Sequence, residues 1–363
     1  MKNGDPLPGA ATFPAGVTEP LLRVRHLSKE FPIRSRGLLR RTVGTVQAVN
    51  DLSFDLYPGE TVGLVGESGS GKTTAARCIV RALAPSAGEI LFRTNGRTVD
   101  LARLSDRALQ PLRPALQLIF QDPFSSLNPR LTVGQIIGEP LVIHRLARGS
   151  ELDDRVDDML LRIGLKPEHR TRYPHAFSGG QRQRIGIARA LIMHPSLIVA
   201  DEAVSALDVS VQAQVLNLLK DLQQEFNLTC LLVAHNLEVV RHVCDRVAVM
   251  YAGRIVELAE TAALFENPRH PYTRALHSAV PRPDPDQRMN CGLAGDAADP
   301  GHLPSGCAFH PRCPECFAPC AQNRPELTDD QPLVRTAGAA PEHLVACHLR
   351  DGRDAGLPGG VRG

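Results

Sequence analysis

The sequence GESGSGKT occupies Gly66–Thr73, between a short apolar run at Thr61–Val65 and a segment of helical character that extends to about Leu83. It fits the pattern G-x-x-x-x-G-K-[ST], in which glycines let the backbone curl until its N–H groups face phosphate oxygens. The helix that follows adds the positive end of its dipole. A glycine-rich turn without a ligand is the weaker alternative, because both flanking elements stand where the pattern requires them.

Two side chains of this loop have distinct expected roles. Lys72 should reach the β- and γ-phosphates of a nucleoside triphosphate, and the Thr73 hydroxyl should bind Mg²⁺. The residues expected around the phosphates are Gly66, Glu67, Ser68, Gly69, Ser70, Gly71, Lys72, Thr73 and Thr74.

A pair of carboxylates, Asp201 and Glu202, ends the apolar run that starts at Leu197. At the carboxyl end of a parallel strand, Asp201 is placed to hold Mg²⁺ or its water. Strand side chains alternate, so Glu202 should point elsewhere, which suits a base that polarises the attacking water. Two solvated acids would be the better interpretation of this pair alone, but the phosphate loop favours function.

Short apolar runs alternate with helical patterns from Thr61 to Met250, which predicts an α/β fold around a parallel sheet covered on both faces. The stretch Val209–Phe226 has clear helical periodicity, and Val156, Met159, Leu160 and Ile163 share one helix face. The expected strands are Thr61–Val65, Leu116–Phe120, Leu197–Asp201, Thr229–His235 and Val247–Met250, with Leu21–Leu27 and Val46–Leu56 in a small antiparallel sheet.

Composition sets the domain plan and excludes several protein classes. The 363 residues are 43% hydrophobic, which is ample for a large core, and the net charge of +2 does not favour a nucleic-acid binder. No run approaches the ~18 apolar residues of a membrane-spanning helix, and the N-terminus lacks the apolar core of a secretory signal. We expect a cytoplasmic protein with a flexible tail over 1–20, a main domain over 21–280 that contains a helical subdomain at 122–178, and a C-terminal extension with a flexible tail over 281–363.

The segment FSGGQRQR, Phe177–Arg184, provides a second phosphate-binding feature. Ser178 and Gln181 have capping-box spacing, so a helix should start here. Its N-terminus offers the amides of Gly179 and Gly180, a serine hydroxyl and a positive dipole end. One nucleotide cannot easily use both sites of one molecule, which favours a head-to-tail dimer over an ordinary capped helix.

In combination, these motifs resemble the ATP-binding subunit of ABC transporters over about Leu21–Leu276. The resemblance implies a P-loop NTPase (RecA-like) core with an antiparallel β subdomain, an inserted helical subdomain and a C-terminal cysteine-containing extension. It also implies an ATPase that uses ATP and Mg²⁺. Glu202 and His235 are the implied catalytic residues, His235 as the switch histidine at the γ-phosphate.

The same resemblance assigns further residues to the ATP site. Gln121 would be the Q-loop glutamine, Asp208 would lie in the D-loop at the dimer interface, and Phe31 would stack on adenine. Mg²⁺ would be held by Thr73, Gln121 and Asp201. Ser178, Gly179, Gly180 and Gln181 would close over the ATP of the partner cassette.

Two longer segments, Gln121–Pro129 (QDPFSSLNP) and Asn267–Leu276 (NPRHPYTRAL), resemble the oligopeptide/dipeptide importers within that family. The chain is more similar to the second of their two ATPase subunit types. This implies import of peptides or similar small solutes, two permease subunits, a second ATPase or a second copy of this chain, an extracytoplasmic binding protein, and a place on the inner face of the membrane. A nickel-chelate or other non-peptide importer and a soluble, non-transport ABC ATPase are the alternatives.

Two positions depart from the family pattern. Ala203 stands where proline is usual, and Asn236 stands where aspartate is usual. Asparagine is as good an N-cap as aspartate, so a helix should still start at Leu237.

Eight of the nine cysteines fall into two groups, and Cys291 stands apart from both. Cys78, Cys230 and Cys244 lie in apolar segments and should be buried. The C-terminal group resembles the extension of the peptide importers, which implies that Cys307, Cys313, Cys320 and Cys347 ligate a [4Fe–4S] cluster. Cys316 makes a C-x-x-C pair with Cys313 that also suits Zn²⁺, and free thiols are the third alternative.

Overall fold

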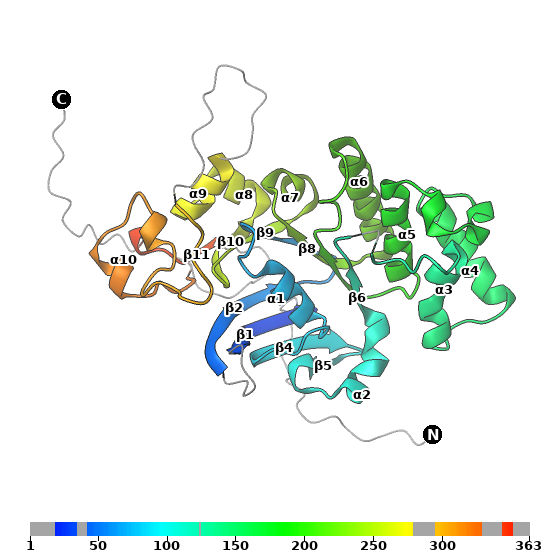
Figure 1. The fold of residues 1–363 in the computed structure, drawn as a ribbon, viewed down its shortest axis with the longest axis horizontal. Coiled ribbons are helices and arrows are strands. Elements are labelled where there is room, and N and C mark those ends of the chain that lie inside the picture. The colour runs from blue at the N-terminus through cyan, green and yellow to red at the C-terminus, as the bar shows by residue number, and fades with distance from the viewer. Residues whose placement is uncertain (1–18, 35–41, 123–124, 279–294, 329–342, 351–363) are drawn as a thin grey trace, which may run out of the picture.

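The computed structural model of the chain describes residues 19–34, 42–122, 125–278, 295–328 and 343–350. A mixed seven-stranded sheet lies at its centre, in the order β11-β10-β9-β3-β8-β7-β6 (Figure 1). Its strands are β3 (Thr61–Val65), β6 (Leu116–Ile119), β7 (Leu197–Asp201), β8 (Thr229–Ala234), β9 (Arg246–Tyr251), β10 (Arg254–Glu260) and β11 (Leu344–Val345). β9, β3, β8, β7 and β6 pair in parallel, as the alternating pattern predicted.

Four of the five parallel strands of this sheet are buried on both faces. Every residue of β3, β7, β8 and β9 is buried. Near-continuous apolar strands are the expected sequence of a parallel sheet with a layer on each side. The α/β fold class predicted from the sequence is therefore confirmed.

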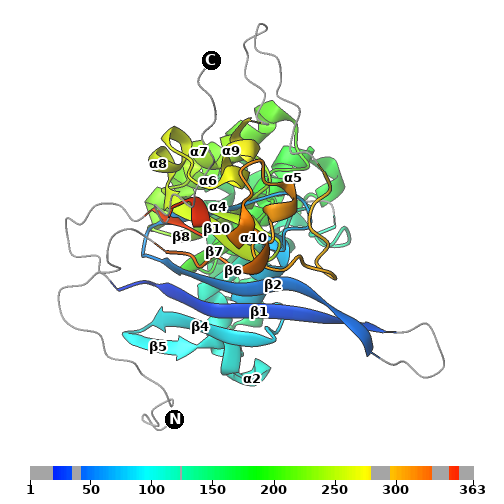
Figure 2. The ribbon, with the colours of Figure 1, turned by 90° about the vertical axis from the view of Figure 1, so that its left-hand side faces the viewer.

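A second, four-stranded antiparallel sheet packs below the first (Figures 1 and 2). Its order is β2-β1-β4-β5, and its strands are β1 (Leu22–Arg34), β2 (Thr42–Leu56), β4 (Ala87–Thr94) and β5 (Arg97–Asp100). Helix α1 (Lys72–Ile79) shares a hydrophobic core with both sheets, to which Leu22, Leu64, Ile79 and Phe92 contribute. The sequence predicted the β1–β2 pair but not the hairpin β4–β5.

Helices cover the other face of the central sheet and extend to one end of the molecule (Figure 1). They are α3 (Val133–Ile143), α4 (Ser150–Arg162), α5 (Gly179–Leu191), α6 (Val209–Phe226), α7 (Leu237–Val243), α8 (Thr261–Glu266) and α9 (Pro271–Ser278), and the short α2 (Asp106–Leu109) adjoins the four-stranded sheet. The predicted apolar face of Val156, Met159, Leu160 and Ile163 is buried. Among the described residues, no helix combines the length and apolarity that crossing a membrane would need.

The C-terminal extension lies at the opposite end from α3 and α4 (Figure 1). It contains the short helix α10 (Ala318–Gln322) and strand β11. β11 joins the edge of the central sheet through the pairs Glu257↔Val345 and Leu258↔Leu344. The extension is therefore packed onto the cassette, and the domain limits given above remain a prediction.

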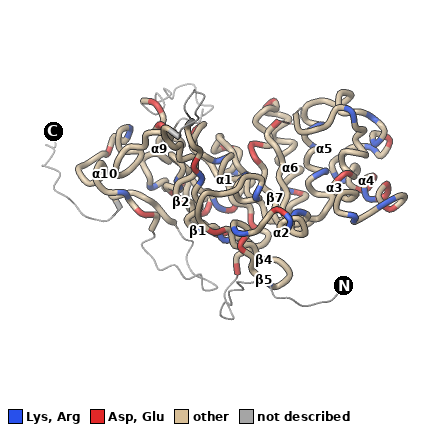
Figure 3. The backbone as a smooth tube through the Cα atoms, turned by 60° about the horizontal axis from the view of Figure 1, so that its bottom comes forward, with Lys and Arg blue, Asp and Glu red and all other residues tan. Residues whose placement is uncertain are grey.

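Charged residues of both signs are interspersed along the described chain (Figure 3). This distribution agrees with the net charge of +2.

Two glycines with left-handed backbone conformation, Gly88 in β4 and Gly96 in the turn between β4 and β5, allow a test of how this sheet is built. Gly88 has φ +95°, and a Cβ there would lie 2.5 Å from the backbone oxygen of His26. Gly96 has φ +72°, but a Cβ there would meet no atom within 4 Å. We expect Gly96→Ala to cost about 1 kcal/mol and Gly88→Ala about 3 kcal/mol or more, because only the second adds a backbone clash to left-handed strain. Urea unfolding followed by circular dichroism measures both, and equal losses would contradict this placement of β4.

Candidate nucleotide site

The carboxyl ends of four parallel strands meet at one edge of the central sheet. Val65 of β3 pairs with Ala234 of β8, and Val233 of β8 pairs with Asp201 of β7. Ile119 of β6 pairs with Ala200 of β7. The segments that follow these strands therefore emerge side by side, which is where ligands bind in open α/β sheets.

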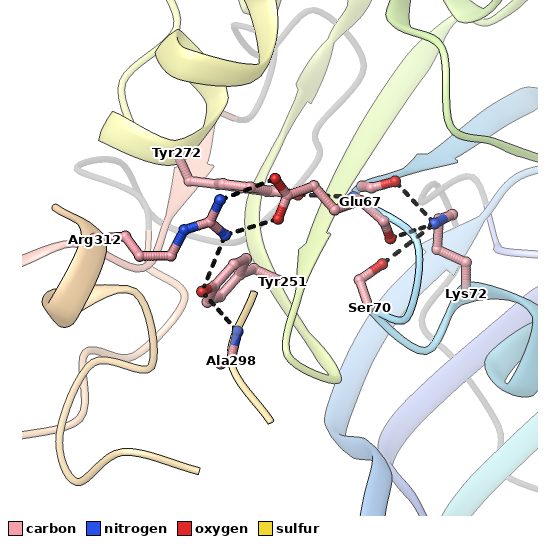
Figure 4. Close-up of polar contacts among 8 residues, drawn as sticks. Glu67, Ser70, Lys72, Tyr251, Tyr272, Ala298 and Arg312 are labelled. Carbon is pink, nitrogen blue, oxygen red and sulfur yellow. Dashed lines mark hydrogen bonds and ion pairs between the residues drawn. The ribbon is translucent and has the colours of Figure 1, made fainter. Parts of the chain in front are cut away.

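The phosphate loop folds around the ammonium group of Lys72 (Figure 4). Its Nζ donates to the carbonyl oxygens of Gly66 and Glu67, both at 2.8 Å, and to Ser70 Oγ at 3.3 Å. Lys72 is 3% exposed, and burial lowers the pKa of its ammonium group. Gly71 has φ +98°, and a Cβ there would lie 1.9 Å from the carbonyl oxygen of Ala48, so this position requires glycine.

Helix α1 begins directly after the loop, and its N-cap residue Gly71 supplies no side-chain hydrogen bond. The N–H groups of a first helical turn have no partner within the helix. A helix start of this kind suits an anion, and phosphate binding by the loop stays a prediction.

Asp201 lies beside the first turn of α1. Thr73 Oγ1 donates to Asp201 Oδ1 at 2.8 Å. The buried Oδ2 lies 3.8 Å from Arg77 Nε and accepts no hydrogen bond from the residues that the structure describes. Burial raises the pKa of Asp201, and the hydrogen bond from Thr73 opposes this. A buried carboxylate oxygen without a hydrogen bond, next to a threonine hydroxyl, is the donor set that Mg²⁺ prefers. These residues therefore fit the ion.

Glu202 turns to different partners from Asp201. Gln121 Nε2 donates to Glu202 Oε2 at 2.8 Å, and His235 Nδ1 lies 3.7 Å from the same oxygen. β7 ends at Asp201, and Glu202 has the left-handed φ of +47°. The divergence of the two carboxylates was predicted, but its cause is this backbone turn as well as strand alternation.

The predicted helix start at Ser178 is confirmed by a complete capping box. Gln181 N donates to Ser178 Oγ at 3.3 Å, and Ser178 N donates to Gln181 Oε1 at 3.1 Å. A Cβ on Gly180 would lie 2.4 Å from Val211 Cγ1, so this turn packs against the start of α6. Asp208 is the N-cap residue of α6, and among the described residues its side chain makes no capping hydrogen bond.

The phosphate loop and the capping turn are separate within one chain. Figure 1 shows α5 well to one side of α1. Within the described residues, no hydrogen bond links Ser178, Gly179, Gly180 or Gln181 to the loop.

Phe31 lies in β1, opposite Val46 of β2, and is 38% exposed. Ala48, two residues further along β2, contacts the loop at Gly71. Phe31 is therefore carried by the strand pair that adjoins the phosphate loop. The Asn236 cap is also confirmed, because its Oδ1 accepts from Glu238 N at 2.8 Å.

The four cysteines that family resemblance selected line one small cavity, together with His270, His310 and Glu315, whereas the exposed Cys316 lies outside it. Burial and the neighbouring thiols raise the pKa values of Cys313 and Cys347 to about 11. In the described ranges, no group of three or more His, Cys, Asp or Glu side chains has the arrangement of a metal site. The thiols converge without forming the geometry of ligands to a single ion.

Sequence reasoning missed three residues near the loop. Tyr251, Tyr272 and Arg312 surround Glu67, and Arg312 comes from the C-terminal extension (Figure 4). Tyr272 lies within Asn267–Leu276, a segment noted for its resemblance without a role. No local pattern marks Arg312 as a neighbour of Glu67.

Fold and site together define an ATPase of the ABC class. The family described as "ABC transporter" matches residues 49–205, and "Oligopeptide/dipeptide transporter, C-terminal region" matches residues 256–320. The oligopeptide transport ATP-binding protein AppF of Bacillus subtilis (strain 168) is 50% identical over 91% of this chain and 98% of its own length. A putative peptide import ATP-binding protein of Brucella ovis is 50% identical over 92% of this chain and 98% of its own length.

The chain belongs to the ATP-binding proteins of ABC transporters, in the oligopeptide/dipeptide group. Solved structures agree on the fold. The dimeric ATP-binding cassette MJ0796 bound to ADP and Pi has a TM-score of 0.57 at 27% identity, over 66% of this chain and 98% of that one. The structure of cbiO1 from Clostridium perfringens has a TM-score of 0.57 at 28% identity, over 68% of this chain and 91% of that one.

The cysteines differ enough in burial for a labelling test. Cys78, Cys230 and Cys244 are buried, as predicted, and burial raises the pKa of Cys230 to about 12. We expect a maleimide to modify Cys316 in the native protein and to reach the three buried thiols only in denaturant, because the reactive thiolate must form and be accessible. Peptide mapping by mass spectrometry identifies the modified residues. Native-state modification of Cys230 at the rate of Cys316 would contradict the structure.

Proposed function

We propose that this chain hydrolyses ATP to energise the import of di- or oligopeptides across the cytoplasmic membrane. The observation that carries the proposal is the meeting, at one sheet edge, of the Lys72 loop, the Thr73–Asp201 pair and the cluster of Gln121, Glu202 and His235. The peptide specificity rests on the match of residues 256–320 to the oligopeptide/dipeptide transporter region.

In the proposed mechanism, the loop binds the triphosphate through backbone N–H groups and Lys72. Lys72 exchanges loop carbonyl oxygens for phosphate oxygens, which keeps its buried charge paired. Thr73, Asp201 and Gln121 would hold Mg²⁺, and the ion would neutralise charge that develops on the phosphates. Phe31 stacks on the adenine ring.

Glu202 acts as the general base for the attacking water. Gln121 donates to Oε2, which leaves Oε1 of the same carboxylate to accept a proton from water. His235 directly follows β8 and lies 3.7 Å from Glu202. In this proposal it hydrogen-bonds the γ-phosphate and helps to align the attacking water. Phosphoryl transfer needs little more than this positioning and charge neutralisation.

The capping turn acts on a second cassette. Ser178, Gly179, Gly180 and Gln181 present a helix N-terminus that lies away from the phosphate loop of the same chain. In a head-to-tail dimer it closes over the partner's ATP, with Asp208 at the interface. A second ABC ATPase is the proposed partner, and a second copy of this chain is the alternative.

The proposed assembly adds two membrane-spanning permease subunits and an extracytoplasmic binding protein, with this chain peripheral on the cytoplasmic side. Two alternatives share the same ATPase chemistry: import of nickel chelates or another non-peptide solute, and a soluble ABC ATPase without a permease. Peptide-stimulated and nickel-chelate-stimulated ATP hydrolysis in reconstituted vesicles would separate the two import functions. A soluble ATPase would respond to neither.

Glu202→Gln should bind ATP and hydrolyse it slowly. The amide keeps the size of the side chain but cannot accept the proton, so we expect kcat to fall about 100-fold or more. Turnover is measured as phosphate release, and ATP affinity with a fluorescent analogue. Glu238→Gln, a change of a half-buried residue in the first turn of α7, is the matched control. Near-normal turnover of Glu202→Gln would reject the assignment of the base.

We further propose that Cys307, Cys313, Cys320 and Cys347 hold a [4Fe–4S] cluster with a structural role, Zn²⁺ being the alternative. Four thiols lining one cavity support it, since four thiolates are the usual complement of such a cluster. Iron, acid-labile sulfide and zinc are measured on protein purified without oxygen. We expect iron and sulfide in the wild type and in Cys316→Ser, and their loss in Cys313→Ser. Zinc alone, or neither metal, would overturn the proposal.

A further inference from the structure

An arginine of the C-terminal extension holds a side chain of the phosphate loop. Arg312 donates from Nη1 to Glu67 Oε2 at 2.8 Å and from Nη2 to Glu67 Oε1 at 3.1 Å (Figure 4). The Arg312 side chain is 7% exposed, and the two residues are 245 positions apart in the sequence. Such a bidentate ion pair fixes the orientation of the Glu67 carboxylate as well as neutralising its charge.

Two tyrosines support the same contact from the cassette. Tyr272 Oη accepts from Glu67 N at 2.8 Å, and Tyr251 Oη lies 3.5 Å from Arg312 Nη1. The centroids of the two tyrosine rings lie 4.7 Å apart. Phe309 of the extension packs edge-on against Tyr251, with 5.3 Å between the ring centroids. Since the Glu67 carbonyl oxygen also accepts from Lys72 at 2.8 Å, this one residue is held at its N–H, its carbonyl and its side chain.

The charges explain why this restraint matters for ATP. Glu67 places a carboxylate within a loop that must accept a triphosphate, and like charges at short range repel. Figure 4 shows the Glu67 side chain directed toward Arg312, on the opposite side from Lys72. Arg312 therefore both neutralises the carboxylate and turns it away from the side on which Lys72 binds phosphate.

We propose that Arg312 is a positioning residue for ATP binding, and that the C-terminal extension completes the nucleotide site through it. Arg312 acts through Glu67 and does not itself contact the nucleotide. Without Arg312, the Glu67 carboxylate is partly buried and unpaired beside the phosphates, which weakens ATP binding. The chemistry at Glu202 is unaffected, so the effect falls on KM rather than on kcat.

The first test compares the steady-state kinetics of ATP hydrolysis in three variants. We expect Arg312→Ala to raise KM for ATP about tenfold and to leave kcat within about twofold. The change leaves the Glu67 carboxylate without its ion pair and does not alter the general base Glu202. Arg312→Lys keeps the charge but loses the planar fork, so its KM should lie between those of wild type and Arg312→Ala. Arg274→Ala removes a more exposed arginine pair to Glu315 of the same extension and is the matched control.

The second test asks whether Arg312 acts through Glu67. In the Glu67→Gln background no carboxylate remains to be neutralised, so adding Arg312→Ala should raise KM no further. A loss of mere packing against Tyr251 would persist in that background and would overturn the proposal. An unchanged KM in Arg312→Ala would also overturn it.

Folding of each variant is checked by circular dichroism and thermal unfolding. If Arg312→Ala fails to fold, Arg312→Lys is compared in the wild-type and Glu67→Gln backgrounds instead, and the expected rise in KM is smaller. A wild-type chain without ATP hydrolysis would contradict the ATPase function itself, which separates that failure from the failure of this inference.

Discussion

The parallel pairing of β3 with β8, and of β8 with β7, is the constraint on which the rest of the site depends. It brings the ends of these strands into register at Val65, Ala234 and Asp201. The phosphate loop and His235 directly follow β3 and β8, and the acidic pair stands at the end of β7. Because the strands are buried along their whole length, the apolar core that fixes the register also fixes the distances across the site.

Within that frame, charge pairing determines how each polar group is held. Lys72 is buried yet fully engaged by its own loop, so the cation is in place before the triphosphate arrives. Thr73 hydrogen-bonds one carboxylate oxygen of Asp201, and within the described part of the chain the other oxygen accepts no hydrogen bond. Arg312 of the C-terminal extension holds the loop through Glu67. Arg312 directly precedes Cys313, which lines the cysteine cavity, so this contact connects that part of the extension to the phosphate loop.

Features encoded by neighbouring residues could be predicted from the sequence, and those that depend on distant contacts could not. The capping box at Ser178, the helix Val209–Phe226 and the buried strands each follow from local spacing. The hairpin β4–β5 was missed although Asn95-Gly96, a typical two-residue hairpin turn, lies between its strands. β11 contributes only two residues. The contact of Arg312 with Glu67 spans 245 positions and leaves no local pattern.

The most direct test of the central claim is purification of the tagged chain from detergent-solubilised membranes, with identification of the proteins that accompany it. Our account predicts two multi-spanning permeases and an ABC ATPase partner, recovered in fixed proportion with the chain. Their appearance would place this ATPase beneath a transporter, and the permeases would indicate its cargo through the binding protein that serves them. Recovery with ribosomes, with DNA-repair factors or alone would contradict the transport function while leaving the ATPase chemistry in place.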